Sequence, residues 1–420
     1  MKSLLDFSGD AFLAAFFLYC LAFVFYVITI SGKMWKKSDP AAHLKRWKVI
    51  SFTTSTLGTI AQITYFFTRW IGGGHIPTSN MYEFMSFLSM MIMVAFTIVY
   101  LIYRTAVLGV FAVPVAIIVM AYASVFPQEV QPLIPALNSI WLKIHVTTAA
   151  TGEAFFAVGF AAGLMYLLRT VDFASKTKKA VRAQRWVEIT LLSVLIIIGF
   201  IASVFTFRAM GYEAVFKQTI VTVDSQQQES SKIEEVKYKL PAIVAPYDSE
   251  TVKFDSFLGM SKPLFEAPSW MNGANAGRKL NTVVWAVISG LVLYGLLRLI
   301  VRKSLGAAIH PAMDGIDPED LDEISYRAIA IGFPLFTLGA LIFAMIWAQI
   351  AWSRFWGWDP KEVWALITWL FYSAYLHLRL SRGWQGTKSS WLAVIGFLVV
   401  MFTLVGVNLV IAGLHSYAGV

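Results

Sequence analysis

The chain has 420 residues, of which 58% are hydrophobic and only 14% are charged, against about 25% charged in an ordinary soluble domain. Apolar runs of about 20 residues recur along the whole length, and this excludes a soluble globular protein because each run can cross a hydrocarbon core as a helix. The net charge of +9 comes without a basic, aromatic-rich soluble segment, so a nucleic-acid-binding face is excluded.

Ten apolar segments are predicted to cross the membrane. The first lacks a small-residue cleavage site, so we expect a retained helix. It contains the only cysteine, Cys20, so any disulfide or CxxC chemistry belongs to a partner. The predicted segments are residues 11–31, 50–70, 83–103, 106–124, 144–168, 187–207, 282–301, 327–350, 361–380 and 389–412.

Lysine and arginine gather in the connections after the first, fifth, seventh and ninth segments. These connections share one side if the segments alternate, and the positive-inside rule makes that side cytoplasmic. One connection on the opposite side, residues 208–281, is long and mixed in charge, and either a small β-rich domain or a loosely ordered excursion fits it. The predicted fold class is an all-α polytopic membrane protein of about ten helices, with both termini external and one long external loop.

The histidines separate by their predicted side. His43 and His310 fall in cytoplasmic connections and are expected to be solvated. His75 lies in the external turn "GGGHIPTSN", where we favour a role in the turn itself. His145 begins the fifth segment and His415 follows the tenth, so both are predicted at the external surface.

Glu153 and His377 lie inside predicted segments, where ionisable groups are functional candidates by default. Glu153 in the fifth segment is expected to pair with a buried polar group. His377 lies about 15 residues, roughly 22 Å, from the outer start of the ninth segment. Its alternative interpretation is a helix-end histidine that extends with Arg379 toward the cytoplasm. In the fifth segment, "GFAAG" at 159–163 is typical of a helix-packing face.

A tryptophan-rich stretch, "WSRFWGWDPKEVWALITWL" (352–370), joins the eighth and ninth segments. An interfacial aromatic belt explains some of these indoles, but a belt would spread them over all helix ends. Asp359, Pro360 and Glu362 are spaced as N-cap, first-turn proline and third residue of a capping box. A paired acid–base or divalent-ion role for the two carboxylates is the alternative.

The two external histidines and the tryptophan-rich stretch are predicted at one surface and one depth. Neutral imidazoles ligate metals, and two of them across an aromatic shelf would suit a planar metal macrocycle. Haem fits this pattern because imidazoles commonly hold its iron. Three nearby cations, Lys143, Arg354 and Lys361, are available to pair with the propionates.

Residues 326–379, "YRAIAIGFPLFTLGALIFAMIWAQIAWSRFWGWDPKEVWALITWLFYSAYLHLR", resemble the tryptophan-rich (WWD) signature of CcsA/ResC-type cytochrome c biogenesis proteins. These are the haem-handling membrane subunits of the system II cytochrome c synthase. The blocks "GHIPTSNMYEFMSFLS", "NSIWLKIHV" and "GVNLVIAGLHSY" resemble the family's other motifs in the same order, so the resemblance covers about 50–175 and 312–420.

The resemblance implies a role for each matching residue. His145 and His415 would be the external haem ligands, and His377 would belong to a haem site within the bilayer. The macrocycle would be cradled by Trp352, Trp356, Trp358 and Asp359.

The resemblance further implies non-covalently bound haem b and a multi-pass location in the bacterial cytoplasmic (inner) membrane, with the tryptophan-rich loop periplasmic. The activity implied is haem transport and thioether formation as a subunit of a holocytochrome c synthase. The implied partners are a CcsB/ResB-type membrane subunit, an apocytochrome c with its CxxCH motif, and a thioredoxin-like thiol reductant.

The chain departs from the family pattern in two places. Ser353 stands where the family usually has glycine after the first signature tryptophan. Residues 176–311, with two segments and the long loop, have no counterpart in the pattern. We therefore predict an N-terminal helical region (1–175), this inserted region, and a tryptophan-rich haem-handling core (312–420).

Two other functions stay open on the sequence. In a proton- or ion-coupled transporter, Glu153 and His377 would line the path, and inverted repeats would be expected, but none is evident. A haem-b electron-transfer subunit would favour histidine pairs stacked within the segments. Here two of the three best candidates are predicted at one surface.

Overall fold

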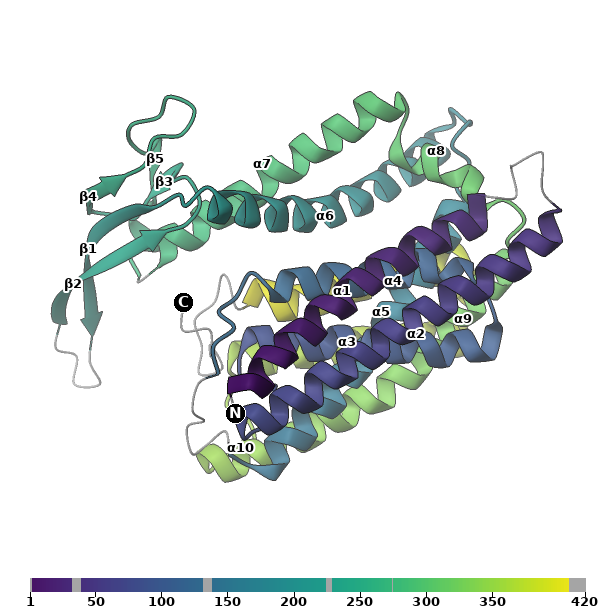
Figure 1. Ribbon diagram of the computed structural model, residues 1–420, viewed down its shortest axis with the longest axis horizontal. Coiled ribbons are helices and arrows are strands. Elements are labelled where there is room, and N and C mark those ends of the chain that lie inside the picture. The colour runs from purple at the N-terminus through teal and green to yellow at the C-terminus, as the bar shows by residue number, and fades with distance from the viewer. Residues whose placement is uncertain (1, 32–38, 131–137, 224–228, 274, 408–420) are drawn as a thin grey trace. The chain divides into compact units, whose positions relative to one another are not determined.

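The computed structural model describes residues 2–31, 39–130, 138–223, 229–273 and 275–407 (Figure 1). The chain forms two compact units, one made of residues 1–181 and 309–419 and the other of 182–308. The helices are α1 (Lys2–Ser31), α2 (Pro40–Gly73), α3 (Met81–Tyr103), α4 (Val107–Ala123), α5 (Ile140–Thr170), α6 (Lys178–Ala209), α7 (Ala276–Val301), α8 (Leu305–Ile309), α9 (Pro318–Phe336), α10 (Ala344–Trp352), α11 (Pro360–Arg382) and α12 (Thr387–Met401). Two π-helical segments, η5 (Thr337–Phe343) and η6 (Phe402–Gly406), continue α9 and α12.

The ten segments predicted to cross the membrane fall on helices as far as they are described. The end of the tenth, residues 408–412, lies outside the described residues. Within the described residues, seven helical stretches are long and apolar enough to span a bilayer: α1, α3, α5, α6, α7, the continuous α9–η5–α10, and α12 with η6. The chain is thus a mostly helical, multi-pass membrane protein. The number of crossings and the sides of the termini stay predictions.

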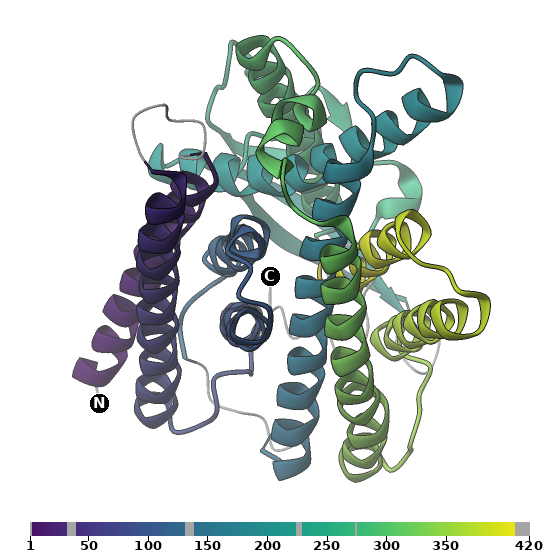
Figure 2. The same ribbon diagram turned by 90° about the vertical axis from the view of Figure 1, so that its right-hand side faces the viewer.

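Helix α5 is the centre of the first unit, and nearly every side chain from Ala149 to Leu168 is buried. It lies beside α9, seen in blue-teal and green in Figure 2, and also packs on α3 and α12. The predicted packing face at 159–163 is confirmed. A Cβ added to Gly159 would lie 2.7 Å from Ile329 of α9, and one added to Gly163 would lie 3.1 Å from Ala393 of α12.

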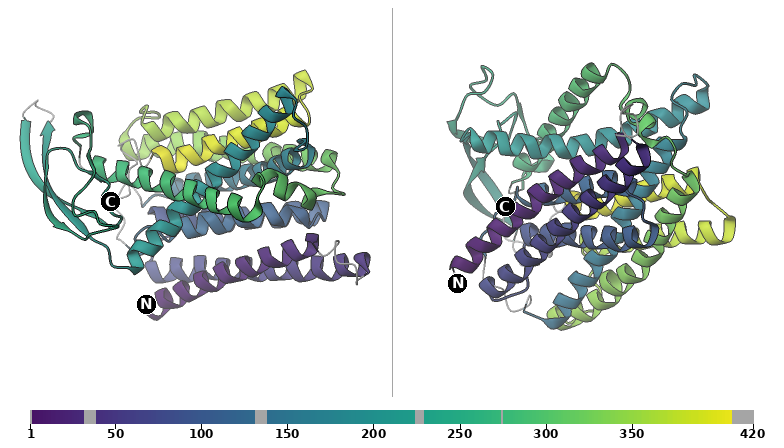
Figure 3. Two further views of the ribbon diagram at one scale, coloured as in Figure 1. Left: turned by 90° about the horizontal axis from the view of Figure 1, so that it is seen from above. Right: turned by 45° about the vertical axis from the view of Figure 1, so that its right-hand side comes forward.

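Helices α1 and α2 form an antiparallel pair (Figure 3), and a buried polar network ties them to α3. The Tyr19 hydroxyl donates to Gln62 Oε1 at 2.7 Å. The amide nitrogen of Gln62 donates to the Ser86 carbonyl and to Ser89 Oγ, both at 3.0 Å. Because every group in this network has a partner, it specifies one packing of the three helices.

The two histidines expected to be solvated are not, so that prediction was wrong. His43 is buried, and its Nε2 lies 3.1 Å from the Ile28 carbonyl oxygen. His310 Nδ1 lies 2.7 Å from the Leu168 carbonyl oxygen. Both rings satisfy carbonyls at the last turn of a neighbouring helix, where intrahelical donors are missing.

Arg379 is also buried, so it does not extend outward as the alternative interpretation of His377 required. Its Nη1 donates to both Asp322 oxygens at 2.7 Å and to Ser389 Oγ at 3.0 Å. This buried ion pair joins α11 to α9 and α12. His377, on the same helix, is exposed.

The long connection is β-rich, which was one of the two predicted possibilities, so the all-α class holds only for the rest of the chain. Antiparallel strands β1 (Ala214–Val223), β2 (Glu229–Tyr238) and β4 (Ser249–Phe254) form a sheet in the order β2-β1-β4. Two short strands, β3 (Val244–Ala245) and β5 (Phe265–Glu266), pair in parallel.

The sheet region is anchored to the start of α7. Asn281 Oδ1 accepts the backbone N–H groups of Ile243 and Val244 at 2.9 and 3.1 Å. Trp285 Nε1 donates to the Pro241 carbonyl at 2.7 Å. These bonds fix the segment that leads into β3.

A small cluster of charged side chains lies at one end of this sheet, where β1 begins and β2 and β4 end. The Lys253 and Lys239 ammonium groups donate to Glu213 at 2.9 and 3.1 Å. These hydrogen bonds lower the pKa of Glu213 to about 2. A carboxyl whose pKa falls on folding stabilises the fold above its unfolded pKa of about 4.3, and that contribution is lost as the pH falls toward the folded value.

Glu213→Gln should therefore speed hydrogen exchange of the β1 and β4 amides at neutral pH. The difference from wild type should shrink below about pH 4.3 and vanish near the folded pKa of about 2. Exchange mass spectrometry of both proteins at the same pH cancels the intrinsic pH dependence of exchange. Equal exchange at neutral pH would show that the cluster adds no stability.

Candidate functional site

A pocket that is partly open to the outside lies within the first unit. Its walls come from α3, α5, α9, η5, α10, α11 and η6 and are mainly apolar. A few polar side chains interrupt this lining, as is typical of ligand pockets. They include Ser79, Asn80, His145, Glu153, Lys361 and Glu362.

His145 lies in the second turn of α5 and faces this pocket. Its Nδ1 is 2.9 Å from the Gly339 carbonyl oxygen. A carbonyl only accepts, so this bond places the ring proton on Nδ1 and the lone pair on Nε2. The imidazole also stacks on Trp347, with ring centroids 6.0 Å apart and planes 11° from parallel. Fixing of one nitrogen by a backbone carbonyl is how proteins orient a metal-ligating histidine.

Gly339 belongs to the π-helical segment η5, and such segments often occur at functional sites. A Cβ added to Gly339 would overlap the Ala149 backbone nitrogen and lie 2.7 Å from Thr148 C. Only glycine lets η5 approach α5 this closely. The approach brings the carbonyl within reach of His145, which is 194 positions away in the sequence.

The signature tryptophans have different surroundings. Trp356 lines the pocket, and its buried Nε1 has no hydrogen-bond partner among the described residues. Trp352 packs edge-on against Trp347, with ring centroids 4.7 Å apart, and thus supports the indole that stacks on His145. Trp358 is 70% exposed. Trp347, only 2% exposed, was missed because a tryptophan inside an apolar segment is usually a core residue.

The predicted capping box at the start of α11 is confirmed. Asp359 Oδ2 accepts the Lys361 backbone N–H at 3.1 Å, and Glu362 Oε2 accepts those of Gly357 and Asp359 at 2.7 and 3.3 Å. Both carboxylates therefore cap the helix. The described residues contain no group of three or more histidine, cysteine or acidic side chains that would favour the divalent-ion alternative.

Of the three cations considered from the sequence, Lys361 lines the pocket. Lys143 and Arg354 do not, and Arg354 is exposed. The capping box that starts α11 thus also places a lysine in the pocket wall.

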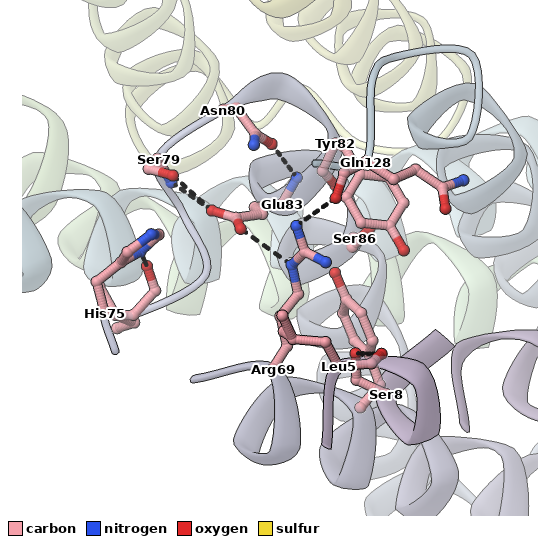
Figure 4. Close-up of polar contacts among 12 residues, drawn as sticks. Leu5, Ser8, Arg69, His75, Ser79, Asn80, Tyr82, Glu83, Ser86 and Gln128 are labelled. Atoms are coloured by element: carbon pink, nitrogen blue, oxygen red, sulfur yellow. Dashed lines mark hydrogen bonds and ion pairs between the residues drawn. The ribbon is translucent and has the colours of Figure 1, made fainter. Parts of the chain in front are cut away.

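A buried ion pair, Arg69–Glu83, lies beside the turn at residues 78–80 that lines the pocket (Figure 4). Arg69 Nε donates to Glu83 Oε1 at 2.9 Å, and Glu83 Oε2 accepts both the backbone N–H and the hydroxyl of Ser79. Arg69 Nη2 donates to the Gln128 carbonyl at 2.8 Å, and its guanidinium lies 5.0 Å from the centre of the Tyr82 ring. The pair therefore joins α2, α3 and the segment after α4.

The same pair shapes the turn before α3. Asn80 is the N-cap of α3, and its side chain accepts the Glu83 backbone N–H at 2.9 Å. Residues 78–81 are held between this cap and the Ser79–Glu83 bonds, and they line the pocket together with residues of α5. Sequence reasoning found this block only through its family resemblance.

The remaining histidine candidates do not line this pocket in the described residues. His415 lies outside the described residues. His377 is 16 positions beyond Lys361 on α11, about 24 Å along the axis, and its Nδ1 lies 3.4 Å from Ser381 Oγ. His75 Nδ1 lies 3.0 Å from its neighbour's carbonyl, that of Ile76.

Glu153 was expected to pair with a buried polar group, and this is not what the structure shows. The residue is only 6% exposed and lines the pocket. Its Oε2 has no hydrogen-bond partner among the described residues.

Gly339→Ala should lower the free energy of unfolding by about 1–3 kcal/mol because the new methyl overlaps the α5 backbone. Thermal unfolding of the purified protein in detergent measures this. The matched control is Gly295→Ala in α7, where an added Cβ meets nothing within 4 Å. Equal melting temperatures for the two variants would contradict the close approach.

Ser353→Gly should raise the free energy of unfolding. Ser353 ends α10 with φ 56°, a left-handed conformation that glycine adopts more readily than residues with a side chain. We expect a gain of about 0.5–1 kcal/mol, since relief of strain exceeds the added entropy of the unfolded glycine. Ser353→Ala, which keeps Cβ, should show no gain in the same melting experiment.

Comparison with known proteins supports the resemblance seen in the sequence. The sequence pattern of the family described as "Cytochrome C assembly protein" matches residues 78–231 and 282–415. These ranges include all of α6 and most of α7, so the part of the predicted inserted region that stays unmatched is 232–281.

Individual relatives are similar over most of their length. The cytochrome c biogenesis protein CcsA of Nostoc punctiforme is 32% identical over 365 residues, which is 86% of each chain. That of Rippkaea orientalis is 31% identical over 373 residues, 86% of this chain and 88% of the relative. The chain therefore belongs to the cytochrome c assembly protein family and is a CcsA-type, multi-pass membrane protein of cytochrome c biogenesis.

Proposed function

We propose that this chain transports haem across the membrane and presents it to the CxxCH thiols of an apocytochrome c. The observation that carries the proposal is the bond from His145 Nδ1 to the Gly339 carbonyl inside a mainly apolar pocket. It leaves the lone pair on Nε2, which is the arrangement that an axial iron ligand needs.

The other pocket residues fit the same cargo. Trp347 and Trp356 supply aromatic surface for a flat macrocycle. The Trp356 N–H, buried without a partner among the described residues, and the Lys361 ammonium can donate to propionate carboxylates. A pocket with one oriented imidazole, indole walls and donors for carboxylates suits haem b held without a covalent bond.

In the proposed mechanism, His145 and His415 ligate the iron on the periplasmic side of the bacterial inner membrane. His377 belongs to a separate site within the bilayer, where cargo enters. Haem supplies the two vinyl groups to which the CxxCH thiols add. The pocket contributes by holding one orientation, which gives proximity to the incoming thiols.

The remaining components come from partners. The only cysteine, Cys20, lies within α1 and the chain has no CxxCH, so it has no motif for attaching haem to itself. We propose a CcsB/ResB-type membrane subunit as the other half of the synthase and a thioredoxin-like protein as the thiol reductant. In this assembly the chain is the haem-handling subunit of a holocytochrome c synthase.

The optical spectrum of the protein purified with its partner subunit tests this function. Wild type should show a bis-imidazole haem b spectrum in the oxidised and reduced states. His145→Ala and His415→Ala should each lose or shift it, and added imidazole should restore it by replacing the missing ligand. His377→Ala should reduce the amount of haem that reaches the external site without changing that site's spectrum.

His310→Ala is the control, because this ring bonds the opposite end of α5 at the Leu168 carbonyl. It should leave the spectrum unchanged, and His75→Ala should do so too if that residue serves only its turn. Wild-type protein that matures cytochrome c yet carries no haem would refute the proposal and favour an ion path through Glu153.

A further inference from the structure

Glu153 is a carboxylate that the proposed function leaves unused. It shares the pocket with His145, 8 positions earlier on α5 and so about 12 Å away along the helix axis. It is 94% buried, and its Oε2 has no hydrogen-bond partner among the described residues. No ion pair within the described residues includes it.

The groups around Glu153 leave its charge without a fixed partner. From α5 itself, His145 faces the pocket, and from α11 come Lys361 and Glu362. Tyr372, also on α11, interacts electrostatically with Glu153, and its buried hydroxyl likewise has no hydrogen-bond partner among the described residues. The walls from α9, η5 and α10 are apolar, α3 adds the apolar Met81 and Phe84, and η6 adds the neutral Thr403.

A buried carboxylate without a partner is costly while it is charged, so its protonation depends on the other charges in the pocket. Bound haem changes that charge by one unit when its iron changes from ferric to ferrous. With two neutral imidazoles, the ferric iron–porphyrin core carries one positive charge and the ferrous core carries none. The ferric state therefore stabilises an ionised Glu153, and reduction removes that stabilisation.

We propose, resting on the haem-binding function above, that Glu153 takes up one proton when haem iron in this pocket is reduced. One electron from an external reductant, a dithiol or dithionite, converts ferric to ferrous iron. One proton from solvent adds to a Glu153 carboxylate oxygen and converts it to the neutral acid. The pocket then keeps its net charge, and the ferrous form that thioether formation uses is stabilised in a site of low polarity.

Potentiometric titration of the purified, haem-loaded complex at several pH values around neutrality tests this coupling. The midpoint potential of wild type should fall with rising pH by about 59 mV for each tenfold drop in proton concentration, which corresponds to one proton per electron. Glu153→Gln, which has the same shape but cannot take up the proton, should show a nearly constant potential. Glu153→Asp keeps a carboxylate and should restore the dependence.

Glu362→Gln is the matched control, because Glu362 lines the same pocket but its Oε2 already accepts two backbone N–H groups. It should keep the wild-type dependence. Propionates contribute equally to all variants, so only differences between them count. A wild-type slope in Glu153→Gln, its loss in Glu362→Gln instead, or a flat wild-type profile would each overturn the proposal. Absence of haem from wild type would show in the spectrum beforehand and would refute the proposed function as well.

Discussion

The pocket depends on the close approach of η5 to α5 at Gly339 and Ala149. Lipid offers no hydrophobic gain from pressing two helices together, so such contacts rely on small residues that let backbones meet. Gly152 extends the same contact one turn further, where an added Cβ would lie 2.6 Å from the Phe336 backbone nitrogen. With the two backbones this close, the π-turn carbonyl reaches His145, and Trp347 on the following helix reaches the face of its ring.

Other walls of the pocket are fixed by polar groups that have hydrogen-bond partners. The Arg69–Glu83 pair and the Asn80 cap fix the turn before α3, and the capping box at Asp359 fixes the start of α11. Buried polar groups without partners are expensive, so the exceptions point to ligands or water. Two of the exceptions, Glu153 Oε2 and Trp356 Nε1, belong to residues that line the pocket. The pocket thus offers one hydrogen-bond acceptor, on Glu153, and one donor, on Trp356. Both support the proposal that it holds haem, whose propionates need donors, beside a carboxylate that can take up a proton.

The second unit combines two helices with a β-rich segment. Its two helices match the family pattern, while residues 232–281, which hold most of β2 and all of β3, β4 and β5, do not. Asn281 and Trp285, at the start of α7, hydrogen-bond the segment that leads into β3 and so anchor the sheet region to that helix. These bonds lie within a single compact unit.

Local signals in the sequence predicted much of this protein. The apolar runs predicted where the long helices lie. The spacing of Asp359, Pro360 and Glu362 predicted a capping box, and the small residues at 159–163 predicted a packing face. Each of these signals is a pattern of residues within a few helical turns. Errors occurred where the partner is distant in the chain: His43 and His310 were expected to be solvated but bond to carbonyls of other helices. Glu153 was expected to have a polar partner, and its Oε2 has none among the described residues. The Gly339 carbonyl, 194 positions from His145, could not be predicted because its role exists only once the two helices meet. The sequence by itself determined the membrane helices and the family; the tertiary structure decided which side chains share the pocket, because helix packing alone brings such distant residues together.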